Sequence, residues 1–208
     1  RALEAEAEYA FRQSLELYPE SPETNFRLAE FYMRLGRFDD ARALIRTYQK
    51  FDVYNSNVSA MLAHIDMMAQ NTRRRQELEG EMARGTVNIN TAIELLTTYQ
   101  RLGMDLQFQN LTLQILSGTN IPPNVCVRVA QICLDSRKWR LFAQSLQRIL
   151  QIDSRNYRCW LDLAYANIML ERPKEMFDAA RRAVEVGGEP AREILRTDAR
   201  FTALLQSP

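Results

Sequence analysis

The residues that carry most enzyme and metal chemistry are sparse in this sequence. Its single histidine is His64, and no cysteine stands at metal-ligand spacing from it. Asp66 follows two residues later, and on a helix that spacing points the two side chains to different faces. Neither a glycine-rich phosphate loop nor a Gly-x-Ser-x-Gly nucleophile turn is present. We therefore predict no catalytic residue, no metal ligand and no cofactor, and we interpret His64 as a surface or groove-facing residue.

Three cysteines are the remaining candidates for chemistry. Cys126 and Cys133 fall on one predicted helix, about 10 Å apart along its axis at 1.5 Å per residue. A disulfide needs Cα atoms within about 7 Å, so these two cannot pair. Cys159 lies next to Trp160 and has no assigned role. We interpret all three as free thiols acting as small core hydrophobes, and the cellular compartment stays open.

Residues 73–75 are three consecutive arginines. They stand at the start of a predicted helix, Arg73–Arg84, where the positive end of the helix dipole disfavours cations. One interpretation is an anion-binding site. The other is a solvated, poorly packed helix in which Glu77, Glu79 and Glu81 compensate the arginines locally. The sequence leaves both open.

Length and charge restrict the function classes. The chain has 208 residues and a formal net charge of +1, so no global field indicates nucleic acid or a membrane surface. Helical-repeat RNA binding, which expects a strongly basic face, is disfavoured for the same reason. No apolar run approaches the roughly 20 residues of a membrane span, so we expect no direct membrane insertion. No signal peptide is visible at the start.

The best-defined stretch is Pro22–Asp52, which predicts two short helices joined by a tight turn. Leu28, Ala29 and Tyr32 mark the inner face of the first helix. Gly36 ends that helix, because glycine enters a left-handed C-cap without a Cβ penalty. The second helix carries an apolar stripe of Phe38, Ala41, Leu44, Ile45 and Tyr48. Such a hairpin cannot bury both its faces alone, so it needs neighbours like itself.

This pattern recurs at intervals of about 34 residues and resembles the tetratricopeptide repeat, a unit of two antiparallel helices. The places of Leu28 and Ala29 are taken in turn by Leu62 and Ala63, Leu95 and Leu96, Val129 and Ala130, and Leu163 and Ala164. Tyr99 and Gly103 repeat Tyr32 and Gly36, and Trp160 fills a place where the family often has tryptophan.

The resemblance implies an all-α fold, a right-handed α-α superhelix of about five to six helix hairpins with a C-terminal capping helix. We expect a single solenoid domain over residues 1–208, which looks like a fragment of a longer protein. The predicted pieces are the second helix of a truncated repeat at 1–19, hairpins at 22–53, 56–86, 89–118, 123–153 and 157–188, and the cap at 190–208. In the cap, Asp198 caps a last helix, and the apolar cover consists of Ile194, Leu195, Phe201, Leu204 and Leu205.

In this family the first helix of each repeat lines the concave side of the superhelix. By register, the groove-facing residues are Phe26, Arg27, Glu30, Met33, Arg34, Met61, His64, Met67, Met68, Glu94, Thr97, Arg101, Arg128, Gln131, Asp162, Tyr165 and Met169. The recurrent methionines suit a surface that adapts to a partner, and the alternative is that half of them are buried between helices. The Lys/Asn clamp of some chaperone-binding members is absent, since Phe26, Glu30, Ala60 and His64 occupy its places.

We therefore predict a non-enzymatic, monomeric protein-interaction module that presents a concave groove to a peptide or neighbouring domain. The alternative is a C-terminal regulatory or docking domain of a larger bacterial enzyme, possibly membrane-bound and glycosyltransferase-like. Arg27, Arg34, Arg101 and Arg128 are the expected polar contacts to a partner. The competing interpretation is that they pair with Glu30, Glu94 and Asp162 and only solubilise the face.

Overall fold

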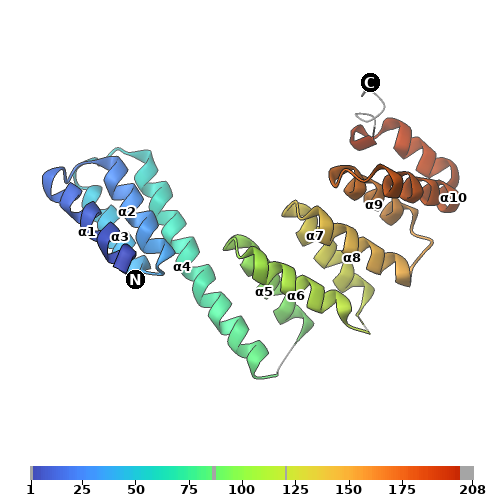
Figure 1. Ribbon diagram of the computed structural model, residues 1–208, viewed down its shortest axis with the longest axis horizontal. Helices are drawn as coiled ribbons and strands as arrows, with labels where there is room; N and C mark the ends of the chain where they lie inside the picture. The colour runs from blue at the N-terminus through green and yellow to red at the C-terminus, as the bar shows by residue number, and fades with distance from the viewer. Residues whose placement is uncertain (1, 86–87, 120, 202–208) are drawn as a thin grey trace. The chain divides into compact units, whose positions relative to one another are not determined.

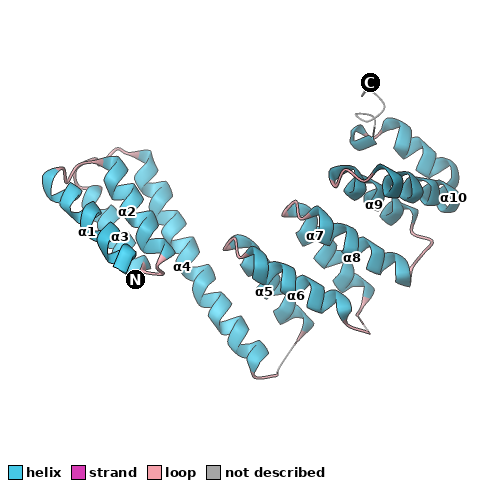
Figure 2. Cartoon of the chain, in the orientation of Figure 1, coloured by secondary structure: helices cyan, strands magenta, loops and turns pink. Residues whose placement is uncertain are grey.

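The computed structural model describes residues 2–85, 88–119 and 121–201. Helices and loops make up all of this described part, and it contains no strand (Figures 1 and 2). The helices are α1 (Ala2–Leu17), α2 (Pro22–Arg34), α3 (Phe38–Tyr48), α4 (Ser56–Ala83), α5 (Ile89–Arg101), α6 (Asp105–Ser117), α7 (Pro123–Asp135), α8 (Trp139–Ile152), α9 (Tyr157–Met169) and α10 (Pro173–Thr197). The predicted fold class, all-α with tetratricopeptide-like helix hairpins, is confirmed.

The chain divides into two compact units, residues 1–77 and 78–208, and the boundary falls within α4. The sequence predicted one solenoid domain, whereas each of these units has its own buried core. We call them the N-terminal unit and the C-terminal unit. The first core gathers residues of α2, α3 and the start of α4, and the second gathers residues from Leu78 to Phe201.

Local sequence chemistry explains the α2–α3 hairpin. The Ser21 side chain accepts a hydrogen bond from the Thr24 amide at 3.3 Å, and Pro22 occupies the first turn of α2. After the helix, Gly36 has a φ of +74°, which lets the Arg37 amide donate to the Tyr32 carbonyl at 2.8 Å. The turn at Gly36 lies where the sequence predicted it, and the Ser21 cap is a finding of the structure.

The other three hairpins use the same turn. Gly103 has a φ of +66° between α5 and α6, as the sequence predicted for a glycine at this place. Between α7 and α8 the corresponding residue is Arg137, with a φ of +54°, and between α9 and α10 it is Glu171, at +56°. A left-handed conformation costs a non-glycine residue roughly 1–2 kcal/mol. Packing of the flanking helices must offset this cost at Arg137 and Glu171.

Residues 56–86 do not form the predicted hairpin. Ser56–Ala83 is one helix of 28 residues, and the predicted second helix, Arg73–Arg84, is mostly its C-terminal part. The three arginines therefore lie mid-helix, away from the dipole end that made their position unusual. Arg74 pairs with Glu77 at 3.0 Å, which is the local compensation that one interpretation expected, and Leu78 is only 1% exposed.

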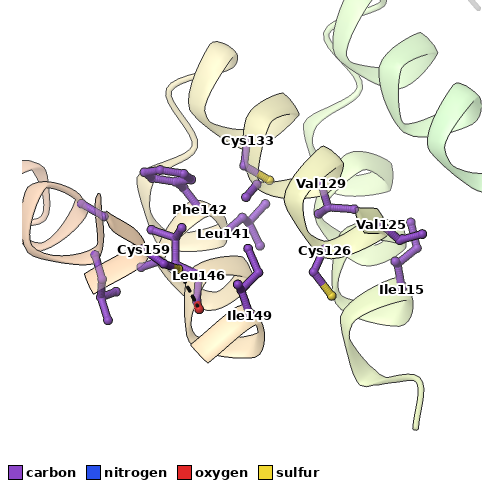
Figure 3. Close-up of a cluster of buried hydrophobic side chains, with 14 of the residues drawn as sticks. Ile115, Val125, Cys126, Val129, Cys133, Leu141, Phe142, Leu146, Ile149 and Cys159 are labelled. Atoms are coloured by element: carbon purple, nitrogen blue, oxygen red, sulfur yellow. Dashed lines mark hydrogen bonds between the residues drawn. The ribbon is translucent and has the colours of Figure 1, made fainter. Parts of the chain in front are cut away.

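The C-terminal unit is built from α5 to α10, which follow one another as stacked hairpins (Figure 1). Its core contains all three cysteines, as Figure 3 shows. The Cys159 thiol donates to the Leu146 carbonyl at 3.6 Å. Burial raises the pKa of both Cys133 and Cys159 to about 12, which keeps these thiols protonated and unreactive. The predicted role as buried free thiols is confirmed.

The C-terminal hairpin ends at a sharp break in α10. Gly188 has φ +60° and ψ −138° inside the helix bounds, next to Pro190, so the sequence boundary at 187–190 is placed correctly. Beyond the break, Ile194 and Leu195 pack against the core, and Phe201 is buried at 5% exposure. The first three apolar residues of the predicted C-terminal cap therefore pack on the core as expected. Leu204 and Leu205 lie outside the described residues.

Two glycines with opposite surroundings provide a matched test of this packing. A Cβ on Gly187 would lie 2.5 Å from Cγ of Tyr157, whereas a Cβ on Gly80 would meet nothing within 4 Å. We expect Gly187→Ala to destabilise the protein by about 1–3 kcal/mol through overpacking. Gly80→Ala should stabilise it by about 0.5–1 kcal/mol. Urea denaturation measures both, and a neutral Gly187→Ala would show that α10 moves freely from Tyr157.

The middle of α4 should exchange its amide hydrogens faster than α6. Between Ile65 and Leu78 only Asn71 is buried on α4, whereas Phe108 and Leu111 anchor α6 in the core. Little buried apolar surface permits local opening. Hydrogen-exchange mass spectrometry should therefore show exchange about tenfold or more faster over residues 69–77 than over α6. Equal protection of the two segments would contradict this interpretation.

Candidate partner-binding surface

Helix α2 presents three of its five predicted groove residues to solvent. Arg27, Glu30 and Arg34 are exposed. Phe26 is half-buried, with its ring 5.6 Å from the Tyr48 ring at an interplanar angle of 68°. Met33 is only 8% exposed and belongs to the core of the N-terminal unit, so it does not line a surface. The three polar residues are thus accessible to a partner, whereas Met33 is part of the core.

The methionines divide between surface and core. On α4, Met67 is 44% exposed, and His64, three residues earlier, is also exposed. Met61 and Met68 are half-buried against the N-terminal core. On α9, Met169 is 43% exposed. The alternative interpretation, burial between helices, therefore holds for Met33 and in part for Met61 and Met68.

In the C-terminal unit, α5 and α7 present polar side chains. Glu94 and Arg101 on α5 and Gln131 on α7 are exposed, and the half-buried Thr97 donates to the Ile93 carbonyl at 3.0 Å. Arg128 on α7 is exposed as well, and its Nη1 atom donates to Oδ1 of Asn90 on α5 at 3.3 Å. The structure thus brings neighbouring first helices into polar contact at this face.

The predicted residues of α9 are already engaged by the C-terminal cap. Nη1 of Arg200 lies 2.9 Å from Oδ1 of Asp162, and the Arg200 guanidinium lies 5.4 Å from the Tyr165 ring centre. On its other side Tyr165 packs edge-on against Trp139, with 5.6 Å between ring centroids. Asp162 and Tyr165 therefore bind the chain's own cap. Sequence reasoning missed Arg200, although its position two residues after Asp198 marked it as a cap residue.

The four predicted arginines differ in how they are paired. Arg27 forms an ion pair with Glu23 at 2.8 Å, and Arg128 contacts Asn90 as described above. Arg34 and Arg101 form no ion pair with any described residue, and each lies in the last turn of its helix. The competing interpretation was that these arginines pair with Glu30, Glu94 and Asp162. It is wrong for Asp162, which pairs with Arg200.

We use the term first-helix face for the exposed members of the predicted set, described separately for each unit. In the N-terminal unit these are Arg27, Glu30, Arg34, His64 and Met67, and in the C-terminal unit they are Glu94, Arg101, Arg128, Gln131 and Met169. Within the described part of the chain, no group of three or more His, Cys, Asp or Glu residues is arranged to hold a metal ion. The face offers hydrogen bonding, charge and soft apolar contact.

A network of charged groups holds α2 in place. Glu8 of α1 accepts from Nη1 of Arg37 at 2.6 Å and from the Tyr32 hydroxyl at 3.1 Å. Arg12 adds a further contact to Glu8 at 2.7 Å. Arg37 also stacks its guanidinium 4.4 Å from the centre of the Tyr32 ring. Three helices therefore meet at one carboxylate, because Arg37 directly precedes α3.

Comparison with known protein families identifies the repeat. Residues 5–65 match the family model described as Tetratricopeptide repeat. Residues 5–65 therefore form a tetratricopeptide-repeat region. The matched residues cover α1, α2, α3 and the first part of α4, which are the elements of the N-terminal unit. No curated protein matches the chain significantly in sequence.

Several solved tetratricopeptide-repeat structures are similar over most of the chain at low identity. YrrB, described as a tetratricopeptide-repeat protein with an unusual peptide-binding site, has a TM-score of 0.42 and 9% identity over 90% of this chain and 97% of that chain. The C-terminal part of a repeat protein from Cytophaga hutchinsonii has a TM-score of 0.47 and 20% identity, covering 98% and 84%. MamA from AMB-1 has a TM-score of 0.42 and 17% identity, covering 83% and 95%.

The matched repeat indicates a coarse function for the fold. Proteins built from this repeat are generally non-enzymatic modules that bind peptides or other proteins, so the fold is that of an interaction scaffold. Within the described residues, no helix combines the length and apolar character needed to cross a membrane.

The Glu8 network predicts an acid-sensitive N-terminal unit. The hydrogen bond that Arg37 donates to Glu8 lowers the pKa of the Glu8 carboxyl below its ordinary value. The resulting stabilisation is present above the unfolded-state pKa of about 4.3 and is lost as the pH falls through the folded-state pKa. We expect Glu8→Gln to destabilise the unit by about 0.5–1.5 kcal/mol at pH 7.

The difference between Glu8→Gln and wild type should shrink as the pH falls from 5 towards 2, when Glu8 itself is protonated. Urea denaturation at several pH values measures it. Glu30→Gln, an exposed glutamate on α2, is the control and should leave stability unchanged throughout. A constant effect of Glu8→Gln at every pH would contradict an electrostatic origin.

Proposed function

We propose that each unit of this protein binds an extended segment of a partner protein on its own first-helix face. The observation that carries the proposal is the placement of Arg34 and Arg101. Each is exposed in the last turn of a first helix, and neither forms an ion pair with a described residue. In this repeat family such helices line the ligand groove. The two guanidinium groups can therefore accept a partner without first breaking an existing ion pair.

The chemistry of the face suits an extended polypeptide. A guanidinium group forks onto a carboxylate or onto backbone carbonyls with two parallel hydrogen bonds. His64 and Met67 add polar and flexible apolar contact on α4 of the N-terminal unit, and Gln131 adds an amide on α7 of the C-terminal unit. Because the side chains stand on helices fixed by buried cores, little ordering is required of the protein when the partner binds.

Charge reversal at the two arginines tests the proposal. Arg34→Glu and Arg101→Glu should each reduce partner capture about tenfold, the loss of one charge-assisted contact plus a new repulsion. The assay is affinity capture from the source lysate with quantitative mass spectrometry. Since both positions are exposed, thermal unfolding should remain close to wild type.

Arg46→Glu is the matched control for Arg34→Glu. Arg46 is also exposed in the last turn of its helix, but that helix is α3, the second helix of its hairpin. Both substitutions place a glutamate at a helix C-terminus and share any unfavourable dipole effect. Loss of capture with Arg46→Glu but not with Arg34→Glu or Arg101→Glu would overturn the proposal and move the binding surface to the second helices.

A further inference from the structure

The guanidinium group of Arg200 lies in a site formed by α9 and α8 of the C-terminal unit. Its Nη1 atom donates to Oδ1 of Asp162 at 2.9 Å, and its Cζ atom lies over the Tyr165 ring, 5.4 Å from the ring centre. Trp139 packs edge-on against that ring at an interplanar angle of 84° and fixes its orientation. A carboxylate beside an aromatic face binds a guanidinium by charge-assisted hydrogen bonding and cation–π attraction. We call Asp162, Tyr165 and Trp139 the α9 arginine site.

Arg200 is compensated mainly by its own segment of the chain. Its Nε atom donates to both carboxylate oxygens of Asp198, at 3.1 and 2.9 Å, and Nη2 donates to Oδ2 of the same residue at 2.7 Å. The guanidinium also lies over the Phe201 ring, 5.6 Å from its centre. By contrast, Asp162 receives a single hydrogen bond from Arg200. The Arg200 side chain can therefore leave α9 without losing the carboxylate that balances its charge.

The Asp162 carboxylate has room for a second hydrogen bond. Its Oδ2 atom accepts none from any residue in the described part of the chain, and the side chain is 40% exposed. A guanidinium that is not already bound to Asp198 can fork onto both oxygens with two parallel N–H groups. An arginine from outside the chain therefore makes one more hydrogen bond to Asp162 than Arg200 makes. Exposed ion pairs contribute little to stability, so Arg200 occupies the site weakly.

We propose that the α9 arginine site binds an arginine side chain of a partner polypeptide, and that Arg200 occupies it in the partner's absence as an internal competitor. The partner's guanidinium forks onto both oxygens of Asp162 and stacks on the Tyr165 ring. Arg200 then turns away with Asp198 and faces solvent. Phe201, which is only 5% exposed, stays in the core and keeps the cap in place.

The openness of the site favours a polypeptide over a free small molecule. The side chains of Asp162 and Arg200 are 40% and 38% exposed, whereas sites for small ligands bury most of the ligand's surface. The present occupant is itself a residue of a polypeptide, whose neighbours in the chain supply further contacts. Met169, 43% exposed, follows Tyr165 by four residues and so lies on the same face of α9. It offers an apolar contact to a segment whose arginine occupies the site.

This proposal is independent of the contacts proposed at Arg34 and Arg101. Those guanidinium groups require carboxylates or carbonyls in the partner, whereas the α9 arginine site requires a cation. The two proposals use different residues and different probes. Failure of one therefore leaves the other to its own test.

The two tryptophans of the chain provide the readout. Trp139 packs on Tyr165, with 5.6 Å between ring centroids, so its indole N–H signal should respond when the site is filled. The indole of Trp160 donates to the Ser154 carbonyl at 2.9 Å and serves as the internal reference. Proton–nitrogen NMR spectra of the full chain record both signals, and Trp160→Phe assigns them.

The probe is Nα-acetyl-argininamide, which is blocked at both ends like a residue within a polypeptide. The matched control Nα-acetyl-citrullinamide keeps the shape of arginine without its charge. A second control, Nα-acetyl-lysinamide, keeps the charge without the planar fork. Free L-arginine distinguishes an amino-acid ligand from a polypeptide one. Each compound is titrated into wild type and variants while the Trp139 signal is followed.

Removal of the internal competitor should open the site. We expect Arg200→Ala and Arg200→Gln to bind the arginine probe with a Kd of about 1–10 mM, about fivefold or more tighter than wild type. Both should bind the citrulline control about fivefold or more weakly than the arginine probe, and the lysine control about threefold more weakly. Combining Asp162→Asn with Arg200→Ala should weaken binding of the arginine probe about fivefold.

Arg196→Ala is the matched control variant. Arg196 is another exposed arginine of the cap and pairs with Glu189 at 3.3 Å, but no aromatic ring is stacked on it among the described residues. Its removal should leave binding of the arginine probe as in wild type. Tighter binding by Arg196→Ala than by the two Arg200 variants would show that cap charge in general, and not Arg200, controls the site.

Other results would also overturn the proposal. Equal binding by wild type and both Arg200 variants would show that Arg200 does not compete, and equal binding of citrulline or lysine would show that the site does not select arginine. Free L-arginine binding about fivefold tighter than the blocked probe would identify an amino-acid site. A fall in Tm of more than about 10 °C in both Arg200 variants would show that the contact with Asp162 is structural and cannot be exchanged.

Discussion

Close packing of helix on helix at alanine positions is the contact on which both units depend. Ala29 of α2 and Ala41 of α3 are completely buried, and so are Ala164 of α9 and Ala183 of α10. A side chain of one methyl group lets two helix axes approach to the near end of the usual 8–10 Å range. The larger residues of each stripe then reach past the partner helix to the next hairpin. Each hairpin therefore needs a neighbour, and stability accumulates along each unit.

The sequence revealed the hairpins through the repeat register, and local turn chemistry agrees with the register at two of the four turns. At Gly36 and Gly103 a glycine occurs where the turn requires a positive φ. Arg137 and Glu171 adopt the same turn without glycine, so only the register could locate those two turns. Over residues 56–86 the register predicted a turn, but no glycine or proline lies between Ser56 and Glu79. Without a local signal to end the helix, α4 continues for 28 residues.

For the candidate site, the sequence could predict only which face of a helix each residue lies on. A face follows from the 3.6-residue period, so exposure of Arg34, Arg101 and Gln131 could be inferred. Engagement of Asp162 by Arg200 depends on how the last segment packs across α9, and no spacing within a repeat encodes that contact. The hydrogen bond from Arg148 of α8 to the Gly118 carbonyl after α6 was equally hidden, because it joins residues 30 positions apart.

Surface charge alone does not define a binding site in this molecule, and the arginines show why. Arg42 pairs with both Asp39 and Asp66, at 2.6 and 2.7 Å, so a partner would have to displace two carboxylates to reach it. Arg46 has no ion pair among the described residues, but it stands on α3, the second helix of its hairpin. An arginine is a candidate contact when lack of an ion pair coincides with a place on a first helix. Arg34 and Arg101 meet both conditions among the described residues, which is why the proposed binding surface rests on them.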